Sequence, residues 1–488
     1  MPKEKILITT PVYYVNAEPH LGHTYTTLAA DILTRWFRLL GKKVFFLTGL
    51  DEHGAKIEQS VEGTGKNPQD FCDEKAMIFK KTWEKFGIEY DNFIRTTEKS
   101  HIKAVENFLR YLKERNYIYK DNYKGFYCIG CEQYKKESDL VNGLCPDHLT
   151  KPVLLDEESY FFKLTEFQED LLKMVENNEI EILPEIRRNE ILEFYKSGLK
   201  DISISRKNVK WGIPLPFDKE YTAYVWIDAF LNYLTGLGWN GDVKKVPDFW
   251  GNAIQLMGKD ISRVHSTIWL ALLKSLNFVP PKKFFINGFF TIDGQKMSKT
   301  IGNVINPLEL IEKFGRDASR FILAHTLYYG QDTDLSWKRL EAEYNDVLVK
   351  NLGNLVSRTL KLAEGNCFAG KKFEFNDFAN EVFKNYSENL ENFKFSEAID
   401  EVLKIVNFAN RYIDQEKPWA DSCSEKGQIV HNLLVFIYYI AFMLNPIMPE
   451  KSREIFDQLG VKEKNLHKIK EKFVFKPLKK ENLFNKIS

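Results

Sequence analysis

The stretch KILITTPVYYVNAEPHLGHTYTTLAADILTRWFRLLGKKVFFLTG, residues 5–49, sets the expected fold. Its first part, 5–15, is rich in β-branched and aromatic residues, which is typical of a buried strand. From Gly22 the apolar residues recur at helical spacing until Gly41, a natural helix stop. A second strand pattern follows at 43–49. The order strand, helix, strand predicts a doubly wound parallel α/β sheet.

The segment His20-Leu21-Gly22-His23 is expected at the turn between this strand and helix, where open α/β sheets bind ligands. Gly22 has no side chain, so a ligand can approach the backbone, and a helix N-terminus favours phosphate. Imidazoles donate hydrogen bonds to phosphate oxygens. Two alternatives stay open on these residues alone: a metal pair completed by Asp51 or His53, and a histidine packed in the core.

Length and charge narrow the class of protein. A chain of 488 residues exceeds the roughly 250–300 residues of a single core, so several domains are expected. The net charge of +1 means that any nucleic-acid contact comes from local patches. No apolar run reaches the ~18 residues needed to cross a bilayer, and the N-terminus has no signal layout. We therefore expect a cytoplasmic protein with no membrane contact.

Six cysteines are too few for a disulfide framework, and three of them cluster. Cys128-x2-Cys131 and Cys145-x2-His148 supply four ligands, enough to close a tetrahedral shell around one Zn²⁺. A closed shell leaves no position for water, so the zinc is expected to be structural. The alternative is a few buried cysteines beside a surface histidine.

The segment DGQKMSKT, residues 293–300, places Lys296 and Lys299 three apart after an Asp-Gly turn signal. Two nearby ammonium groups repel unless an anion lies between them, and the departing pyrophosphate of ATP is such an anion. Taken alone, this pair is more typical of a solvated loop.

The last 28 residues, 461–488, hold nine lysines and three glutamates. They favour a solvated end over a nucleic-acid-facing patch.

Together these motifs resemble the class I aminoacyl-tRNA synthetases. HLGH is similar to their signature HIGH, with Leu21 in place of isoleucine, and KMSKT is similar to KMSKS, with Thr300 keeping the final hydroxyl. The closer resemblance, over essentially the whole chain, is to the methionyl-tRNA synthetase family in its one-zinc form. It rests on PVYYVNAEPHLGH, FLTGLDEHG, YVWIDAFLNYL, GKDISRVHSTIW, NLGNLVSR and KPWA.

The resemblance implies roles for individual residues. Catalysis would rest on His20, His23, Lys296 and Lys299. ATP would bind at His20, Gly22, His23, Gly258, Asp260, Lys296, Ser298 and Lys299, with Gly258 and Asp260 at the ribose hydroxyls. Methionine would bind at Val12, Tyr14, Asp51, Trp226, Ala229, Tyr233 and His265, with Asp51 on its ammonium group. Asn354, Arg358 and Trp419 would read the CAU anticodon, although Trp419 by itself favours a position in a helical core.

The implied domains are two halves of a Rossmann-like catalytic domain, 1–116 and 226–290, separated by a connective insertion with the zinc knuckle, 117–225. A loop and stem-contact region, 291–345, and an α-helical anticodon-binding domain, 346–488, follow. The implied activity joins L-methionine to tRNA(Met) with ATP and Mg²⁺. Longer family members carry an appended domain that forms the dimer. This chain ends soon after the helical region, so a monomer is expected. Two rival interpretations are another class I synthetase, such as a cysteinyl enzyme, and a non-catalytic tRNA-binding protein.

Overall fold

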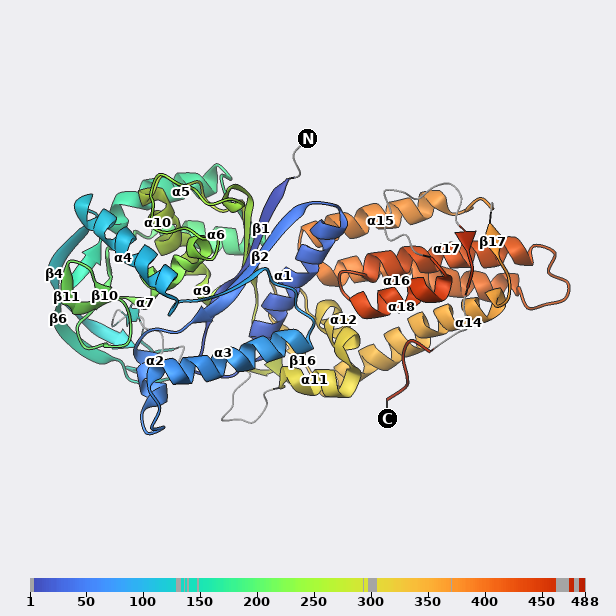
Figure 1. Cartoon of the computed structure of the whole chain (residues 1–488), viewed down its shortest axis with the longest axis horizontal. Helices are drawn as coiled ribbons and strands as arrows, with labels where there is room; N and C mark the ends of the chain where they lie inside the picture. Colours follow the sequence, from blue (N-terminus) through green and yellow to red (C-terminus); the bar gives the residue numbers. More distant parts are fainter. Residues whose placement is uncertain are drawn as a thin grey trace.

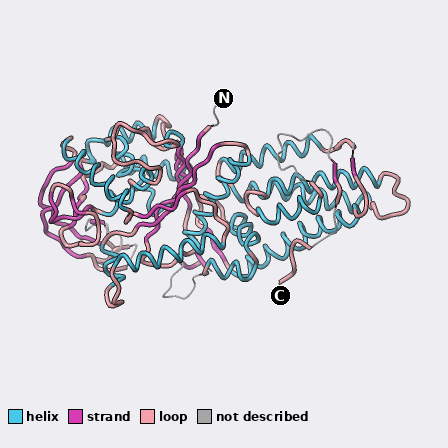
Figure 2. Tube along the Cα trace, viewed as in Figure 1, coloured by secondary structure: helices cyan, strands magenta, loops and turns pink. Residues whose placement is uncertain are grey.

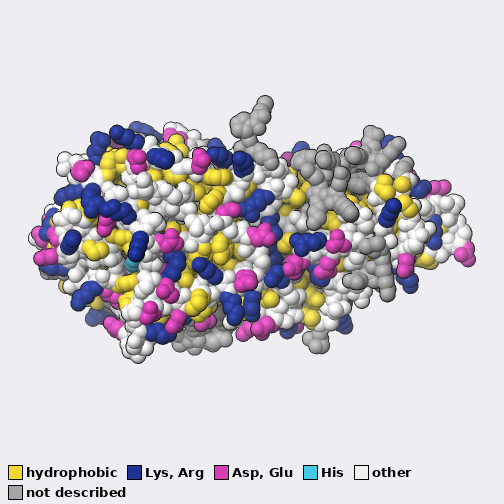
Figure 3. Space-filling view, in the orientation of Figure 1, with side chains coloured by type: hydrophobic (Ala, Val, Ile, Leu, Met, Phe, Trp, Pro, Cys, Tyr) yellow, Lys and Arg dark blue, Asp and Glu magenta, His cyan; other side chains and the backbone are white. Residues whose placement is uncertain are grey.

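The computed structural model describes residues 4–128, 133–135, 137, 140–146, 149–292, 294–296, 305–369, 371–461, 474–477 and 482–487. These residues form two parts side by side, a sheet-containing part and an elongated helical domain (Figure 1). Strands are concentrated in the first part, while helices make up most of the second (Figure 2). Lys, Arg, Asp and Glu are interspersed over the face shown in Figure 3.

A parallel six-stranded sheet in the order β3-β2-β1-β12-β13-β7 forms the centre of the first part. Its strands are β1 (Lys5–Tyr14), β2 (Lys43–Asp51), β3 (Asn92–Arg95), β7 (Glu181–Leu183), β12 (Ala253–Gly258) and β13 (Lys283–Asn287). From β1 the chain winds outward through β2 to β3, and from β12 it winds the other way to β13. The switch point lies between β1 and β12, and the doubly wound prediction is confirmed.

Alternating residues of the central strands divide the core between the two faces of the sheet. Ile6 and Ile8 of β1 pack with α1 (Leu21–Leu39), whereas Leu7 packs on the opposite face. The first face also holds α2 (Ala55–Val61) and α3 (Pro68–Lys85). The opposite face holds α4 (Lys99–Glu114), η2 (Leu164–Phe167), α5 (Gln168–Glu176), α6 (Glu185–Lys196), α7 (Val225–Phe230), α8 (Asn232–Thr235), α9 (Lys259–Val264), the π-helix η4 (His265–Trp269) and α10 (Leu270–Ser275). The short turn η3 (Trp250–Asn252) leads into β12.

The expected insertion forms small antiparallel sheets of its own. One has the order β5-β4-β6-β8, and the other has the order β10-β11-β9. Their strands are β4 (Ile118–Cys128), β5 (Gln133–Lys135), β6 (Val153–Phe162), β8 (Ile202–Ser203), β9 (Ser205–Arg206), β10 (Pro214–Leu215) and β11 (Asp218–Ala223). However, β7 also falls within 117–225 and pairs in parallel with β13 at the edge of the central sheet. The insertion therefore contributes a strand to the sheet that it interrupts.

The region after the central sheet joins it to the helical domain. It contains β14 (Phe290–Ile292), β15 (Gln295–Lys296), β16 (Thr333–Leu335), α11 (Pro307–Phe314), α12 (Arg316–Thr326) and α13 (Trp337–Ala342). Buried Arg320 of α12 bonds Asp31 Oδ2 of α1 at 2.6 Å and the backbone oxygens of Ile447 and Phe86 at 2.7 and 3.0 Å. This guanidinium ties the helix after β1 to the helical domain.

The helical domain consists of the π-helix η5 (Glu343–Gly353), α14 (Asn354–Ala363), α15 (Asn376–Glu391), α16 (Phe395–Glu416), α17 (Lys426–Leu444) and α18 (Pro449–Leu459). The short strand β18 (Val474–Phe475) pairs with β17 (Phe368–Ala369). By length and composition alone α17 is apolar enough to cross a membrane, but 89% of its apolar window is buried inside this domain. A helix that is apolar on all sides fits the core of a bundle.

Candidate active site and nucleic-acid interface

The two signature histidines stack at the start of α1. His20 caps the helix: its Nδ1 accepts from the Gly22 N–H at 3.0 Å, and its ring lies 3.7 Å, centroid to centroid, from that of His23. Because Nδ1 is the acceptor, a neutral His20 carries its proton on Nε2. A Cβ on Gly22 would lie 2.9 Å from His20 Cε1. The glycine is therefore required by the capping imidazole itself, and not only by an approaching ligand.

His23 is a neutral imidazole. Its ring lies 4.6 Å from that of Tyr13 and 5.8 Å from that of Phe79. Burial first, and then the neighbouring charge of His20, lower the pKa of His23 well below its usual value. The metal alternative loses support, because His53, one of its further ligands, is bonded to Asp228, and no group of three His, Cys, Asp or Glu among the described residues could hold a metal.

The ends of β1, β2 and β12 bring the other predicted ligand residues to this edge of the sheet. Tyr14 pairs with Asp51 in the register of β1 and β2, and Asp51 is buried. Across the switch point, Gly258 ends β12 and caps α9, which contains Asp260. A Cβ on Gly258 would lie 2.5 Å from Asp260 Oδ1. Here too, a glycine makes room for a polar side chain two residues further on.

Three of the residues predicted to enclose a methionine side chain, Trp226, Tyr233 and His265, belong to one aromatic cluster. Tyr233 Oη lies 2.8 Å from His265 Nε2, and His265 Nδ1 lies 2.8 Å from the backbone oxygen of Ile261. The carbonyl can only accept, so Nδ1 carries the proton and Tyr233 donates to Nε2. Burial lowers the pKa of His265 to about 4, so the imidazole is neutral near pH 7. The Tyr233 hydroxyl therefore donates its one hydrogen bond to His265.

Sequence reasoning gave no role to Phe230, which lies inside this cluster. Its ring is 4.8 Å from His265, 5.8 Å from Trp226 and 6.0 Å from Trp269. Trp226 and Ala229 of α7 are half-buried beside it, and Val12 of β1 is half-buried on the same face of the sheet. The helical spacing of 226, 229, 230 and 233 was the available signal for this shared face.

A buried polar network beside this cluster was also missed. Asp228 bonds His53 Nδ1 at 2.6 Å and His101 Nε2 at 2.7 Å, and His101 Nδ1 contacts Thr235 Oγ1 at 2.7 Å. Burial by itself raises the pKa of Asp228, but the two histidines outweigh it and bring the pKa to about 2. The carboxylate holds α7 against the loop after β2 and against α4. Two predicted methionine-binding residues are close in sequence to this network: Asp51 precedes His53 by two residues, and Trp226 precedes Asp228 by two.

The second signature is described only in part. Lys296 ends β15, whose backbone pairs with Thr291 of β14. Asp334 Oδ1 accepts from Thr291 Oγ1 at 2.7 Å and from the Gly294 N–H at 2.6 Å, which fixes the turn before the loop. Ser298, Lys299 and Thr300 lie outside the described residues, as do Cys131 and His148 of the expected zinc knuckle. Cys128 and Cys145 are described and buried.

The predicted anticodon residues lie together on the helical domain. Arg358 Nη2 bonds Asp414 Oδ1 of α16 at 2.5 Å, and its guanidinium lies 5.7 Å from the centroid of the Trp419 ring. Asn354 begins α14 and donates to the backbone oxygen of Lys350 at 2.8 Å. Trp419 is 52% exposed, so the alternative that places it in a helical core is wrong. An exposed indole beside a guanidinium suits the stacking of unpaired bases.

Two family models match most of the chain. The family model described as "tRNA synthetases class I (M)" matches residues 6–151 and 148–360, and the one described as "Anticodon-binding domain of tRNA ligase" matches residues 374–487. The chain is 38% identical over 478 residues to a protein of Thermotoga maritima named "Methionine--tRNA ligase", covering 94% of this chain and 76% of that protein. Its identity to the protein of the same name from Fusobacterium nucleatum is 40% over 477 residues, covering 94% and 75%.

A solved structure gives the same result for the fold. "Mycobacterium tuberculosis methionyl-tRNA synthetase in complex with methionyl-adenylate" matches with a TM-score of 0.93 at 31% identity, and the match covers 99% of each chain. The likeness therefore extends over both the sheet-containing part and the helical domain. The chain belongs to the methionine–tRNA ligase family of class I tRNA synthetases.

Proposed function

We propose that this chain activates L-methionine with ATP and transfers it to the 3′-terminal adenosine of tRNA(Met), supplying both initiator and elongator Met-tRNA for translation. The observation that carries the proposal is the switch point of the sheet. His20 and His23 follow β1 on one side of it, and on the other Gly258 ends β12 and Asp260 lies in α9. A nucleotide across this edge has its phosphates at the N-terminus of α1 and its ribose at Asp260.

In the first step, a methionine carboxylate oxygen bonds the α-phosphorus of ATP, and the bond from that phosphorus to the bridging oxygen breaks. Pyrophosphate leaves, and methionyl-adenylate forms. Neutral His23 and the capping His20 donate hydrogen bonds to the crowded phosphate, and Lys296 and Lys299 hold the leaving group. When bound with ATP, Mg²⁺ supplies charge neutralisation at the phosphates. Positioning and charge stabilisation carry the rate, and no general base is needed.

In the second step, the 2′-hydroxyl of the terminal adenosine attacks the methionyl carbonyl carbon, and AMP leaves. Asn354, Arg358 and Trp419 read the CAU anticodon far from this reaction. The separation is supported by the positions of Asn354 and Arg358 on α14 and of Trp419 just after α16, in a different part of the molecule from β1 (Figure 1). The lysine-rich segment 461–488 lies largely outside the described residues.

Methionine is held by a buried carboxyl group, which binds any amino acid, and is selected by an aromatic enclosure of its side chain. Asp51 binds the ammonium group, and Tyr14, Trp226, Ala229, Tyr233 and His265 surround the side chain. Aromatic contacts with a thioether contribute roughly 0.3–1.5 kcal/mol each. Because Tyr233 donates to His265, the sulfur meets ring faces and edges in preference to that hydroxyl. A single methylene changes binding by only ~1–3 kcal/mol, so homocysteine is activated to a measurable degree.

One structural Zn²⁺ bound by Cys128, Cys131, Cys145 and His148 completes the proposal. The described half of this ligand set is compatible with the metal: Cys128 ends β4, and the Cys145 oxygen accepts from the Leu149 N–H at 2.8 Å. Both thiols are at most 1% exposed. When bound, the ion closes the knuckle. Less than about half an equivalent of zinc in the purified protein contradicts this assignment.

The activity is tested by charging purified tRNA with radiolabelled methionine. We expect ATP-dependent incorporation into tRNA(Met). Periodate-treated tRNA, whose terminal ribose diol is destroyed, is the matched control and accepts nothing. Incorporation that does not depend on ATP, or incorporation into the oxidised tRNA, contradicts the proposed reaction. A cytoplasmic, monomeric enzyme is the accompanying expectation, and its mass in solution tests the monomer.

A further inference from the structure

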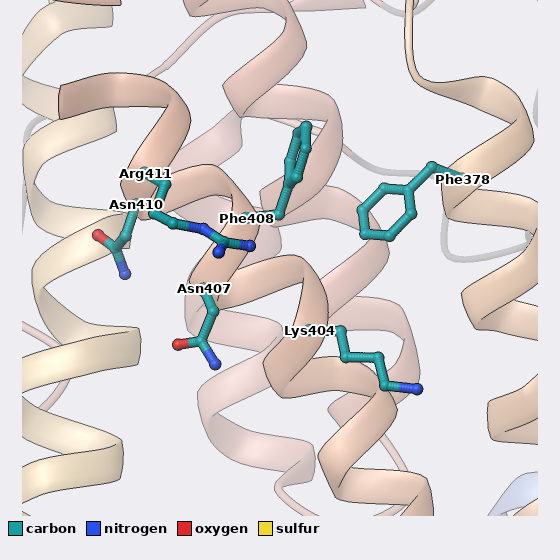
Figure 4. Close-up of a pocket in the computed structure, with 6 residues that line it drawn as sticks. All are labelled: Phe378, Lys404, Asn407, Phe408, Asn410 and Arg411. Atoms are coloured by element: carbon teal, nitrogen blue, oxygen red, sulfur yellow. The ribbon is translucent and has the colours of Figure 1, made fainter. Parts of the chain in front are cut away.

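A hollow of about 630 Å³ lies on the helical domain, away from the histidines of α1. It is lined by Phe378 of α15 and by Lys404, Asn407, Phe408, Asn410 and Arg411 of α16 (Figure 4). All six residues fall within 374–487, the segment matched by the anticodon-binding family.

The lining combines two aromatic rings with two cations. The rings of Phe378 and Phe408 lie 4.9 Å apart, and both are half-buried. Figure 4 shows Phe378 directed toward Phe408 from the neighbouring helix, with the Arg411 guanidinium beside Phe408. Lys404 is paired with Glu401 at 2.6 Å, whereas exposed Arg411 has no hydrogen-bond or ion-pair partner among the described residues. Sites that bind single-stranded nucleic acids combine aromatic rings with cationic side chains in this way.

The hollow adjoins the predicted anticodon residues. Asn351 of η5 donates to Asn407 Oδ1 at 2.8 Å and accepts from Asn410 Nδ2 at 2.8 Å, and it lies three residues before Asn354. One turn beyond Asn410 on α16, Asp414 bonds Arg358. From Lys404 to Asp414 the helix rises about 15 Å at 1.5 Å per residue. The hollow is therefore linked through Asn351 to the helix that carries Asn354, and through α16 to Asp414, the partner of Arg358.

We propose that this hollow binds a nucleotide of the tRNA anticodon loop outside the CAU triplet, with its base against Phe378 and Phe408 and its phosphate on Arg411. The proposal rests on the proposed function, because it takes tRNA as the partner. Unpaired loop bases are recognised by stacking on aromatic side chains, and phosphates by Arg. Arg411 is the stronger ligand of the two cations, since Lys404 already has a carboxylate partner.

The test uses the full chain and a synthetic anticodon stem-loop RNA hairpin with the CAU triplet. Arg411→Ala is expected to weaken hairpin binding about tenfold, and Phe378→Leu, which keeps the apolar volume, fivefold or more. Losing one phosphate contact lowers the slope of log K against log salt by about 0.7 for Arg411→Ala. Lys384→Ala is the matched control: this exposed lysine of α15 pairs with Glu388 and does not line the hollow. It leaves affinity and slope unchanged.

An abasic scan of the hairpin loop locates the nucleotide. At one loop position outside the triplet, removal of the base is expected to weaken binding to the wild type but not to Phe378→Leu. Affinities of Arg411→Ala and Phe378→Leu within twofold of the wild type, with an unchanged salt slope, overturn the proposal and leave the hollow to a protein partner. Methionine-dependent ATP–pyrophosphate exchange is measured on the same preparations. Its absence in the wild type refutes the proposed function, and its presence with unaffected hairpin binding refutes only the role of this hollow.

Discussion

The proposed amino-acid site and the proposed anticodon-binding face differ in how far their side chains are buried. At the sheet edge, Tyr233, His265 and Asp228 are almost wholly buried, and each has hydrogen-bond partners within the protein. On α16 and beyond it, Arg411 and Trp419 are exposed. A small ligand can be surrounded by protein, so the side chains of its site are held in place by other buried groups. A polyanion is bound on the outside, so its site keeps donors and rings turned toward solvent.

This difference predicts how the two regions respond to substitution. Variants at the sheet edge should change amino-acid activation, and through their buried partners they should also change stability. Variants on the helical face should change tRNA charging and little else. The buried Arg320–Asp31 pair that joins the two parts belongs to neither class, because it contacts both.

The largest effect is expected at the two signatures. His20→Ala and Lys299→Ala should each lower the rate of methionyl-adenylate formation by about 10²–10³-fold, the usual cost of losing one donor to a developing charge. Single-turnover adenylation measures the rate, and methionine affinity should change less than threefold. Zinc content serves as the control and should be unchanged. Near-normal adenylation in either variant refutes that residue's role.

Trp419→Ala should come next, with a loss of about 5–150-fold in kcat/KM for tRNA charging, since a stacked base contributes roughly 1–3 kcal/mol. Because the indole is 52% exposed, the thermal midpoint should hardly change. Aminoacylation at varied tRNA concentration measures the effect. Equal losses in charging and in tRNA-free exchange would contradict the separation of the two regions.

Asp228→Asn should reduce the free energy of unfolding by on the order of 2 kcal/mol at pH 7. The folded-state pKa of about 2 lies below the ordinary value of 3.8, so this carboxylate stabilises the fold above about pH 4. That contribution is lost as the pH falls from about 4 to about 2. Denaturant melts of both proteins across this range should therefore converge toward low pH. A stability difference that stays constant down to pH 2 would show that ionisation of Asp228 is not its source.

Tyr233→Phe should have the smallest effect, a rise of a few-fold in the KM for methionine with little change in kcat. The variant keeps the ring that contacts the methionine side chain and removes only the hydroxyl that orients the His265 imidazole. Since the pKa of His265 is about 4, its imidazole is neutral at both pH 6 and pH 8. The ratio of variant to wild-type KM should therefore be the same at these two values, and a ratio that differs between them argues for a charged His265.

The sequence predicted the βαβ order and the position of HLGH because both depend only on residues close together in the chain. The βαβ period change and the placement of HLGH at the turn required only the order of residues 5–49. The Asp228 network could not be found in this way, since His53 and His101 lie 175 and 127 residues from Asp228. The exposure of Trp419 depends on how the chain turns after α16, where Lys417 adopts a left-handed conformation. Similarly, nothing local indicates that β7 returns to the central sheet.

The most direct test of the account is ATP–pyrophosphate exchange by the purified chain, without tRNA, with each of the twenty amino acids in turn. We predict exchange with methionine well above that with any other, because the aromatic enclosure selects a thioether side chain before tRNA binds. Exchange that is fastest with cysteine or another amino acid would contradict the substrate, and exchange with none of the twenty would contradict the account as a whole.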